Sequence, residues 1–398
     1  MNSKAIIAIA VVAVVAIAGV SAFVLLGDKK DSAEYDGSAF NVISRVNSEG
    51  SGLYVDKEYV DTTGDMPVRK DTDTPFFGTN YTLSEANKDA WGGLIFGDPG
   101  ASSIQHTQLA SIAQKVGLKF TQYLDGTTTE ADTLYYITNL SNKGLVETND
   151  KINGGILWEP QFQRIITELS TKYTTLALTN DVFKGHTCCI VAANHNWLGE
   201  NSDNTVKFLA GYAQAVKFIN DAKAAGSGDN YDWLVSFAMT TTTGLSEAEV
   251  KAALSNITYL VADDTSGSLS GLEKDISSLA SDLKDLGLIT SKKFENADKF
   301  SEAFVDDSYL KDALDNKAKT TGTGTVKVAV ISGDIHQLAI HVAKEKGYFS
   351  QYGLTVDLAT GANGGEIANM LLSKDVNIGF LGAPPATLNT INGDHILV

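Results

Sequence analysis

The sequence predicts an α/β protein of two lobes, and two stretches of alternating strands and helices support that prediction. Residues 92–180 and residues 326–381 each contain short buried strands separated by amphipathic helices. Such alternation is typical of right-handed crossovers in a parallel sheet. A chain of 398 residues is long enough to form two units of this kind, each with its own core.

The C-terminal block is expected to alternate regularly. Alternating apolar residues predict a strand over 326–332. Apolar residues at helical spacing predict a helix over 336–346, and a second strand follows at 355–358. Ile367–Leu372 mark the apolar face of another helix. The continuous apolar run 376–381 is typical of a buried parallel strand.

The other block repeats this order. Residues 93–97 predict a strand that enters a glycine-rich loop, and a helix is expected over 103–116. A further strand lies within 152–158. The proline that opens 160–169 fits the first turn of a helix, where its missing N–H breaks no hydrogen bond. Residues 176–178 complete the block as a strand.

Between the two blocks the pattern predicts one more buried strand and several long helices. The strand is 188–193, which we expect to belong to the first lobe. Amphipathic stretches at 204–224, 246–255 and 269–286 predict helices that cover this lobe. Residues 56–90 contain two prolines and many Thr and Asp residues, so we expect a loop-rich insertion there.

The first segment predicts a membrane anchor. Ala5–Leu26 is a run of 22 apolar or small residues without a charge, and about 20 such residues span a bilayer. A secretory signal usually has a shorter apolar core, of about 7–15 residues. We therefore favour an uncleaved signal-anchor over residues 1–27, followed by a polar tether over 28–39. Cleavage, which would release a secreted body, stays open.

Composition and motifs narrow the classes of function. The net charge of −17 argues against nucleic acid and against basic patches that bind anionic lipid. The six histidines show no metal-ligand spacing and no catalytic signature stands out, so we expect no metal, no cofactor and no enzymatic activity. Cys188 and Cys189 are adjacent, which favours a packed pair over a functional dithiol. Neither lies near the N-terminal segment, which argues against lipidation there.

The C-terminal block resembles the first lobe of extracytoplasmic solute-binding proteins of the nitrate, sulfonate, taurine and thiamine-pyrimidine-precursor (NMT1-like) group. The matching residues are AKEKGYF at 343–349, YGLTV at 352–356, and the helix and strand at 364–386. Further similarity to the group is seen at 97–118, 156–160, 186–198 and 304–314. The order departs from the family, because the segments that open its first lobe come last in this chain.

The resemblance implies a two-lobed periplasmic-binding-protein fold, type II-like and circularly permuted. Lobe one would combine 40–60, 184–314 and 326–398, while 61–183 would form lobe two. Residues 315–325 would be the linker that joins the family's usual end to its usual start. Closure within one chain is the favoured interpretation, and a domain-swapped dimer is the alternative.

A ligand site is expected where the loops after parallel strands gather. Glycines let the main chain approach a ligand, and free N–H groups at helix starts attract anions or oxygen-rich groups. Each loop alone is more often an ordinary turn, but the set together favours a cleft. The residues expected to contact the ligand are Gly333, Asp334, His336, Gln337, Gly382, Ala383, Pro384, Ser51, Gly52, Gly100, Ser102, Ser103, Trp158, Glu159, His186 and Thr187.

Some of these residues have structural alternatives. Trp158 and Glu159 resemble a cleft motif of the family's second lobe, but a core tryptophan and a solvated glutamate are equally good readings. His106 could also face the cleft, or have a core or surface role. Of the three arginines, Arg45 alone lies close to a candidate loop, which mildly disfavours a doubly charged anion.

The resemblance implies the substrate-binding component of an ABC importer, located outside the cytoplasm and held at the membrane by its N-terminal helix. The solute would be small and polar or anionic, such as nitrate, a sulfonate, taurine, bicarbonate or a pyrimidine-like compound. The expected partners are this solute, a permease and an ATPase, and we expect a monomeric body. A pyrimidine-precursor enzyme of the same fold and a ligand sensor without transport are the alternatives.

Overall fold

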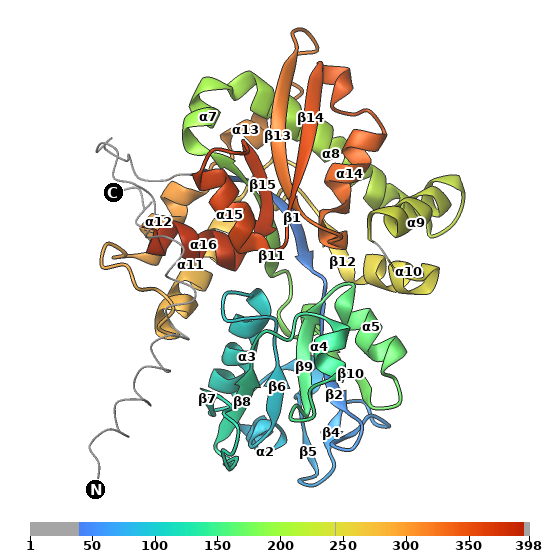
Figure 1. Ribbon diagram of the computed structural model, residues 1–398, viewed down its shortest axis with the longest axis vertical. Helices are drawn as coiled ribbons and strands as arrows, with labels where there is room; N and C mark the ends of the chain where they lie inside the picture. The colour runs from blue at the N-terminus through green and yellow to red at the C-terminus, as the bar shows by residue number, and fades with distance from the viewer. Residues whose placement is uncertain (1–39, 243, 394–398) are drawn as a thin grey trace, which may run out of the picture. The chain divides into compact units, whose positions relative to one another are not determined.

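The computed structural model describes residues 40–242 and 244–393. This part of the chain is a mixed α/β structure with two six-stranded sheets and one small three-stranded sheet (Figure 1). The expected anchor and tether, residues 1–27 and 28–39, lie outside the described residues. Among the residues that are described, no helix combines the length and the apolar character needed to cross a bilayer.

The first sheet joins the beginning of the described chain to its end. Its strand order is β12-β1-β11-β15-β13-β14. In Figure 1 the blue strand β1 therefore lies in one sheet with the orange and red strands. β13 runs parallel to β14 and β15, whereas β11 is antiparallel to both β15 and β1. The strands are β1 (Phe40–Glu49), β11 (Thr187–Asn194), β12 (Ile257–Tyr259), β13 (Gly324–Ile331), β14 (Leu354–Gly361) and β15 (Ile378–Gly382).

The second sheet is built from the middle of the N-terminal half. Its strand order is β10-β2-β9-β6-β8-β7. β6 runs parallel to β8 and β9, and β2 is antiparallel to β9 and β10. The strands are β2 (Ser51–Asp56), β6 (Ile95–Gly97), β7 (Lys119–Gln122), β8 (Thr133–Ile137), β9 (Gly154–Trp158) and β10 (Tyr173–Leu178).

The predicted helices are confirmed, with ends that shift by a few residues. They are α3 (Ile104–Lys115), α5 (Gln161–Glu168), α8 (Ser202–Ala225), α10 (Glu247–Asn256), α11 (Ser270–Asp285), α14 (Leu338–Glu345) and α15 (Gly364–Leu372). Further helices are α9 (Asp229–Thr241), α12 (Ala297–Phe304), α13 (Ser308–Leu314) and α16 (Ala383–Asn392), the last with prolines in its first turn. The short helices are α2 (Lys88–Trp91), α4 (Lys143–Glu147), α6 (Thr179–Val182) and α7 (His195–Glu200).

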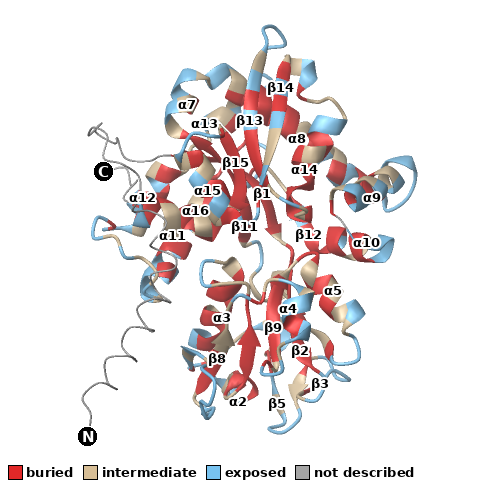
Figure 2. Cartoon of the chain, in the orientation of Figure 1, coloured by how far each residue is buried: buried red, intermediate tan, exposed pale blue. Residues whose placement is uncertain are grey.

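Each sheet is covered by its own apolar clusters. One large cluster packs around the first sheet and contains side chains of β1, β11, β13 and β15 together with α8 and α14. Two smaller clusters lie against the second sheet, one including the apolar side of α3 and the other that of α5. Figure 2 shows the buried strands of both sheets in red. Burial of this apolar surface is the main contribution to folding.

The stretch 56–90 is loop-rich as predicted, but it also contributes to the core. It forms the three-stranded sheet β3 (Val60–Asp61), β4 (Val68–Arg69) and β5 (Thr74–Pro75). Directly after it, the rings of Phe76 and Phe77 lie 5.2 and 5.6 Å from the ring of Trp91, both at steep angles. The three rings are fully buried in the α3-side cluster of the second sheet.

The expected boundary of lobe one at residue 60 is wrong. β1 ends at Glu49, and β2, which begins at Ser51, already belongs to the second sheet. The chain crosses between the sheets at Gly50, where Glu49 and Gly50 both have positive φ, 67° and 87°. Two left-handed residues in succession redirect the main chain sharply, which explains how one residue can separate strands of two sheets. Ser51 and Gly52 are therefore strand residues, not loop residues.

We predict that Gly50→Ala destabilises the fold more than the same change at Gly185. Both glycines have positive φ, 87° and 71°, which costs an alanine about 1–2 kcal/mol. A Cβ at Gly50 would also lie 2.3 Å from Nε2 of His336, whereas one at Gly185 meets nothing within 4 Å. We expect urea denaturation to give a loss of about 1 kcal/mol for Gly185→Ala and roughly 3 kcal/mol or more for Gly50→Ala. Equal losses would show that the crossing tolerates a side chain.

Candidate ligand-binding site

The loops after the parallel strands of the first sheet lie at one edge. β13 and β15 run parallel, so the loop 332–337 and the segment 382–384 leave the sheet at the same side. The Ser332 N–H donates to the carbonyl of Gly361, which ties the loop after β13 to the end of β14. A Cβ on Gly364 would lie 2.7 Å from Pro385, so the starts of α15 and α16 are in contact.

The second sheet has a corresponding edge. β6, β8 and β9 are parallel and end at Gly97, Ile137 and Trp158. Ser51 pairs with Trp158, so β2 begins at this edge. The loop 98–103 leads into α3, whose first turn is capped because the Ser103 hydroxyl accepts the His106 N–H at 3.1 Å. Ser102 is exposed beside this cap.

The two edges meet at the carbonyl of Gly50. This oxygen accepts a hydrogen bond from Nε2 of His336 at 3.0 Å and another from the main-chain N–H of Glu159 at 2.8 Å. His336 belongs to the loop after β13 of the first sheet, and Glu159 follows β9 of the second. The structure therefore brings two of the predicted residues together at the crossing between the sheets, which we call the junction.

His336 is held as a cation. Its Nδ1 lies 2.9 Å from Oδ1 of Asp334, and its Nε2 faces the Gly50 carbonyl. Both partners can only accept, so both ring nitrogens must carry hydrogen. Burial alone would favour the neutral ring, but the Asp334 carboxylate and the Gly50 carbonyl outweigh it and raise the pKa of His336 to about 9. The Asp334 side chain also accepts the His336 main-chain N–H at 3.0 Å.

Glu159 is a fully buried carboxyl group with one oxygen in use. Its Oε1 accepts from Nδ2 of Asn256 at 2.8 Å and from Nε2 of Gln163 at 3.1 Å. Its Oε2 has no hydrogen-bond partner within the described ranges 40–242 and 244–393. Burial raises the pKa of Glu159, although the two amide donors oppose this. The solvated glutamate considered as an alternative is therefore wrong.

His186 presents a free lone pair. Its Nδ1 donates to the carbonyl of Phe183 at 2.8 Å. Burial lowers the pKa of His186, so the ring is neutral and Nε2 is an acceptor. That atom is buried and has no partner among the residues the structure describes.

Three other predicted contact residues use their polar atoms inside the chain. Gln337 accepts the Ile331 N–H at 2.8 Å and donates to the Phe380 carbonyl at 3.0 Å. The Ser51 hydroxyl accepts from Nε2 of Gln105 at 2.9 Å. The third is Thr187, described below. These side chains hold the edges of the sheets in place, because buried polar groups need such partners.

Gly52 also has a packing role. A Cβ at this position would lie 2.4 Å from the ring of Phe162, so only glycine lets α5 approach β2. Gly382 and Ala383 lie where β15 passes into α16, and Pro384 is buried in the first turn of that helix. Gly100 has a φ of 150° in the loop after β6, where its N–H donates to Asp98 at 2.8 Å. These five positions shape the main chain of the two edges.

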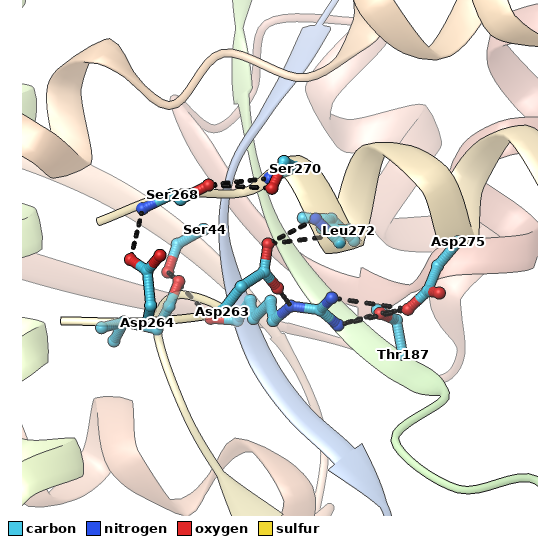
Figure 3. Close-up of polar contacts among 11 residues, drawn as sticks. Ser44, Thr187, Asp263, Asp264, Ser268, Ser270, Leu272 and Asp275 are labelled. Atoms are coloured by element: carbon cyan, nitrogen blue, oxygen red, sulfur yellow. Dashed lines mark hydrogen bonds and ion pairs between the residues drawn. The ribbon is translucent and has the colours of Figure 1, made fainter. Parts of the chain in front are cut away.

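Thr187 belongs to an ionic network in which Arg45 is buried and its two carboxylate partners are partly exposed. Nε of Arg45 lies 2.6 Å from Asp263, and its Nη2 lies 3.4 Å from Asp275. The Thr187 hydroxyl contacts the Arg45 guanidinium and donates to Asp275 at 2.7 Å. Figure 3 shows Asp263 and Asp275 on two sides of this network, with Thr187 beside Asp275. Two carboxylates thus neutralise the guanidinium, so Arg45 offers no spare charge to an anion.

The cysteine pair lies inside β11. Cys188 and Cys189 are free thiols, both buried, with sulfur atoms 3.8 Å apart. This arrangement agrees with the packed pair that was predicted. No group of three or more His, Cys, Asp or Glu side chains in the described part of the chain has the arrangement needed for a metal ion.

Asn256 and Asp98 at the two edges were not predicted, whereas His106, the partner of Asp98, was considered as a residue that could face the cleft. Asn256, at the end of α10, reaches Glu159 across about 100 residues of sequence, and no local pattern indicates that contact. Asp98 and His106 form a buried pair, with Nδ1 of His106 2.8 Å from Asp98. The His106 ring packs edge-on against Tyr136 at 4.8 Å. Asp98 directly follows a strand, so its place in the sequence could have indicated that it lies at this edge.

Comparison with known proteins agrees with the resemblance of the C-terminal block. Residues 335–397 match the family model described as NMT1/THI5 like. This part of the chain is similar to that family. The match confirms the resemblance predicted for that block, while the similarities at 97–118, 156–160, 186–198 and 304–314 remain predictions.

One solved structure is also similar to this chain. It is described as the ligand-binding component of an ABC-type import system from Staphylococcus aureus with zinc bound. The two chains are 17% identical over 70% of this chain and 75% of that chain, with a TM-score of 0.43. No curated protein matches the sequence.

We predict that the stabilisation supplied by His336 is lost as the pH rises. Its pKa is raised from 6.5 to about 9, so this contribution is fully present below pH 6.5 and disappears between about pH 6.5 and 9. The shift corresponds to about 3 kcal/mol. Urea denaturation should give a larger difference between wild type and His336→Gln at pH 6 than at pH 9.5. His195→Gln is the control, and a pH-independent difference for His336→Gln would contradict a charged ring.

Proposed function

We propose that this protein is the substrate-binding component of an ABC importer and that it binds a small polar solute at the junction. One observation supports this most. The edges where the parallel strands of the two sheets have their C-terminal ends meet at one residue, Gly50. Ligands of α/β sheets bind at such edges. The crossing at Gly50 and the second one over residues 179–186 also give two short hinges about which the sheets could close on a ligand, as in binding proteins that work by domain closure.

We also propose that the chain is a circular permutation of the family's order and that it closes within one molecule. Asp306, just before α13, donates its N–H to Val42 of β1 at 2.8 Å, so the expected family end lies beside the first strand. The linker 315–325 is held to α8 by Lys207, which donates to the Thr321 carbonyl at 2.8 Å. Such contacts support a monomeric body, which light scattering at several concentrations would test.

Location and partners follow from the same proposal. An importer component works outside the cytoplasm, and its partners would be a permease and an ATPase. The N-terminal segment 1–27 would be the anchor that keeps the body at the membrane. The enzyme alternative is less well supported, because the cysteine pair is buried in a central strand. A neighbouring gene pair for a permease and an ATPase would favour transport over a sensor.

We predict that Ser102→Ala weakens solute binding without unfolding the protein. Ser102 is exposed at the loop before α3, and loss of one hydrogen bond of about 0.5–1.5 kcal/mol corresponds to roughly a 2- to 12-fold weaker affinity. The solute would first be found by thermal-shift screening of a broad panel of small polar compounds, and its affinity measured by titration calorimetry. Ser227→Ala, an exposed serine between α8 and α9, is the matched control.

Two results would count against the proposal. Failure of every compound in a broad panel to bind the soluble body would argue against a solute-binding role. Binding that is equally strong in the Ser102→Ala, Trp158→Ala and wild-type proteins would keep the role but move the site away from the junction.

A further inference from the structure

The junction carries a set of buried hydrogen-bond acceptors whose lone pairs are unused. They are Oε2 of Glu159, Oδ1 of Asn256, Nε2 of His186 and Oδ1 of Asn47, and none has a partner among residues 40–242 and 244–393. Most buried polar atoms in proteins are hydrogen-bonded, so a group of four such acceptors in one region needs an explanation.

All four residues form hydrogen bonds with the main chain of three consecutive residues, Glu49, Gly50 and Ser51. Asn47 donates to the Glu49 carbonyl at 3.1 Å, and the carbonyl of His186 accepts the Glu49 N–H at 3.2 Å. The N–H of Glu159 donates to Gly50, as described above. Asn256 lies 3.5 Å from the Ser51 carbonyl. The unused acceptors therefore surround the crossing between the sheets.

The donors of the junction, in contrast, are already occupied. Both ring nitrogens of His336 face acceptors, and the Arg45 guanidinium faces two carboxylates. The amide nitrogen of Asn256 donates to Glu159. Among these groups of the junction, the acceptors therefore lack partners while the donors already have them.

Negatively charged groups outnumber positively charged groups at the junction. His336 is matched by Asp334, and Arg45 is matched twice over. Glu49 is held by neutral donors, the N–H of Gly185 and the hydroxyl of Thr258.

Glu159 accepts from two amides, and the cation that acts on it is His336, whose charge Asp334 already matches. Burial raises the pKa of Glu159, and a cationic solute beside it would favour the ionised form. Lys223, which donates to the carbonyl of Ile257 opposite Glu49, is a third cation at the junction. The carboxylates Asp334, Asp263, Asp275 and Glu49 still outnumber His336, Arg45 and Lys223 before Glu159 is counted, so an anion would be repelled and a cation attracted.

We propose that the solute is a small organic cation with an ammonium or amidinium group, whose N–H donors are accepted by Glu159 and Asn256. His186 and Asn47 supply further acceptors for the same solute. This inference rests on the proposed function and narrows its substrate class. It departs from the anionic members of the polar or anionic solutes that the family resemblance implies. Because the four atoms are buried, the solute reaches them when the two sheets move apart about Gly50.

The test compares cations with anions on the soluble body of the protein. The cationic probes are putrescine and benzamidine, and the anionic probes are nitrate and methanesulfonate, all at the same ionic strength. We expect at least one cation to raise the melting temperature and to bind in titration calorimetry. Glu159→Gln should then weaken that binding by 10-fold or more, because the carboxylate is its counter-charge. Glu345→Gln, which removes an exposed carboxylate of α14, should leave it unchanged.

Each outcome is decisive. Binding of an anion and not of a cation would overturn the inference while the proposed function stands. Binding of neither class would overturn the inference and weaken the proposed function with it. If a cation binds but Glu159→Gln has no effect, the solute is not held where we place it. Circular dichroism of each variant checks that the fold is intact.

Discussion

The carbonyl group of Gly50 organises this molecule. It receives one hydrogen bond from each half of the fold, a charged one from His336 and a main-chain one from Glu159. Only glycine fits, because the backbone is left-handed there and the His336 ring occupies the space of a side chain. The two sheets can therefore be described as separate cores joined by two crossings, the tightly specified one at Gly50 and a second over residues 179–186, between β10 and β11.

Near the Gly50 connection the charges of Arg45 and His336 are paired with carboxylates of the chain itself. Arg45 extends from β1 to two carboxylates. Asp263 precedes α11, and Asp275 lies within that helix. Asp334 fixes the orientation of His336 before any ligand is present. Because these charges are already paired inside the chain, they contribute to the shape of the junction more than to recognition of a solute.

Much of the fold followed from the sequence, and the reasons are local. The continuous apolar run near Val376 and the helical spacing around Leu338 indicate their elements directly, and both are confirmed. The boundary near residue 60 was wrong because β2 looks like a continuation of β1, and only the backbone at Glu49 and Gly50 separates them. Part of the site was also out of reach, since the Asn256–Glu159 contact joins distant segments.

The composition of the first sheet has a consequence for synthesis of the protein. All strands of the second sheet lie between residues 51 and 178, so that sheet can assemble as soon as this stretch leaves the ribosome. The first sheet takes β1 from one end of the described chain and β15 from the other, so β1 can pair with β11 only after residue 194 is made, and the sheet is complete only after β15. Until β11 is made, the apolar surface of β1 has no strand of its own sheet to pair with, which makes the first sheet the slower of the two to form.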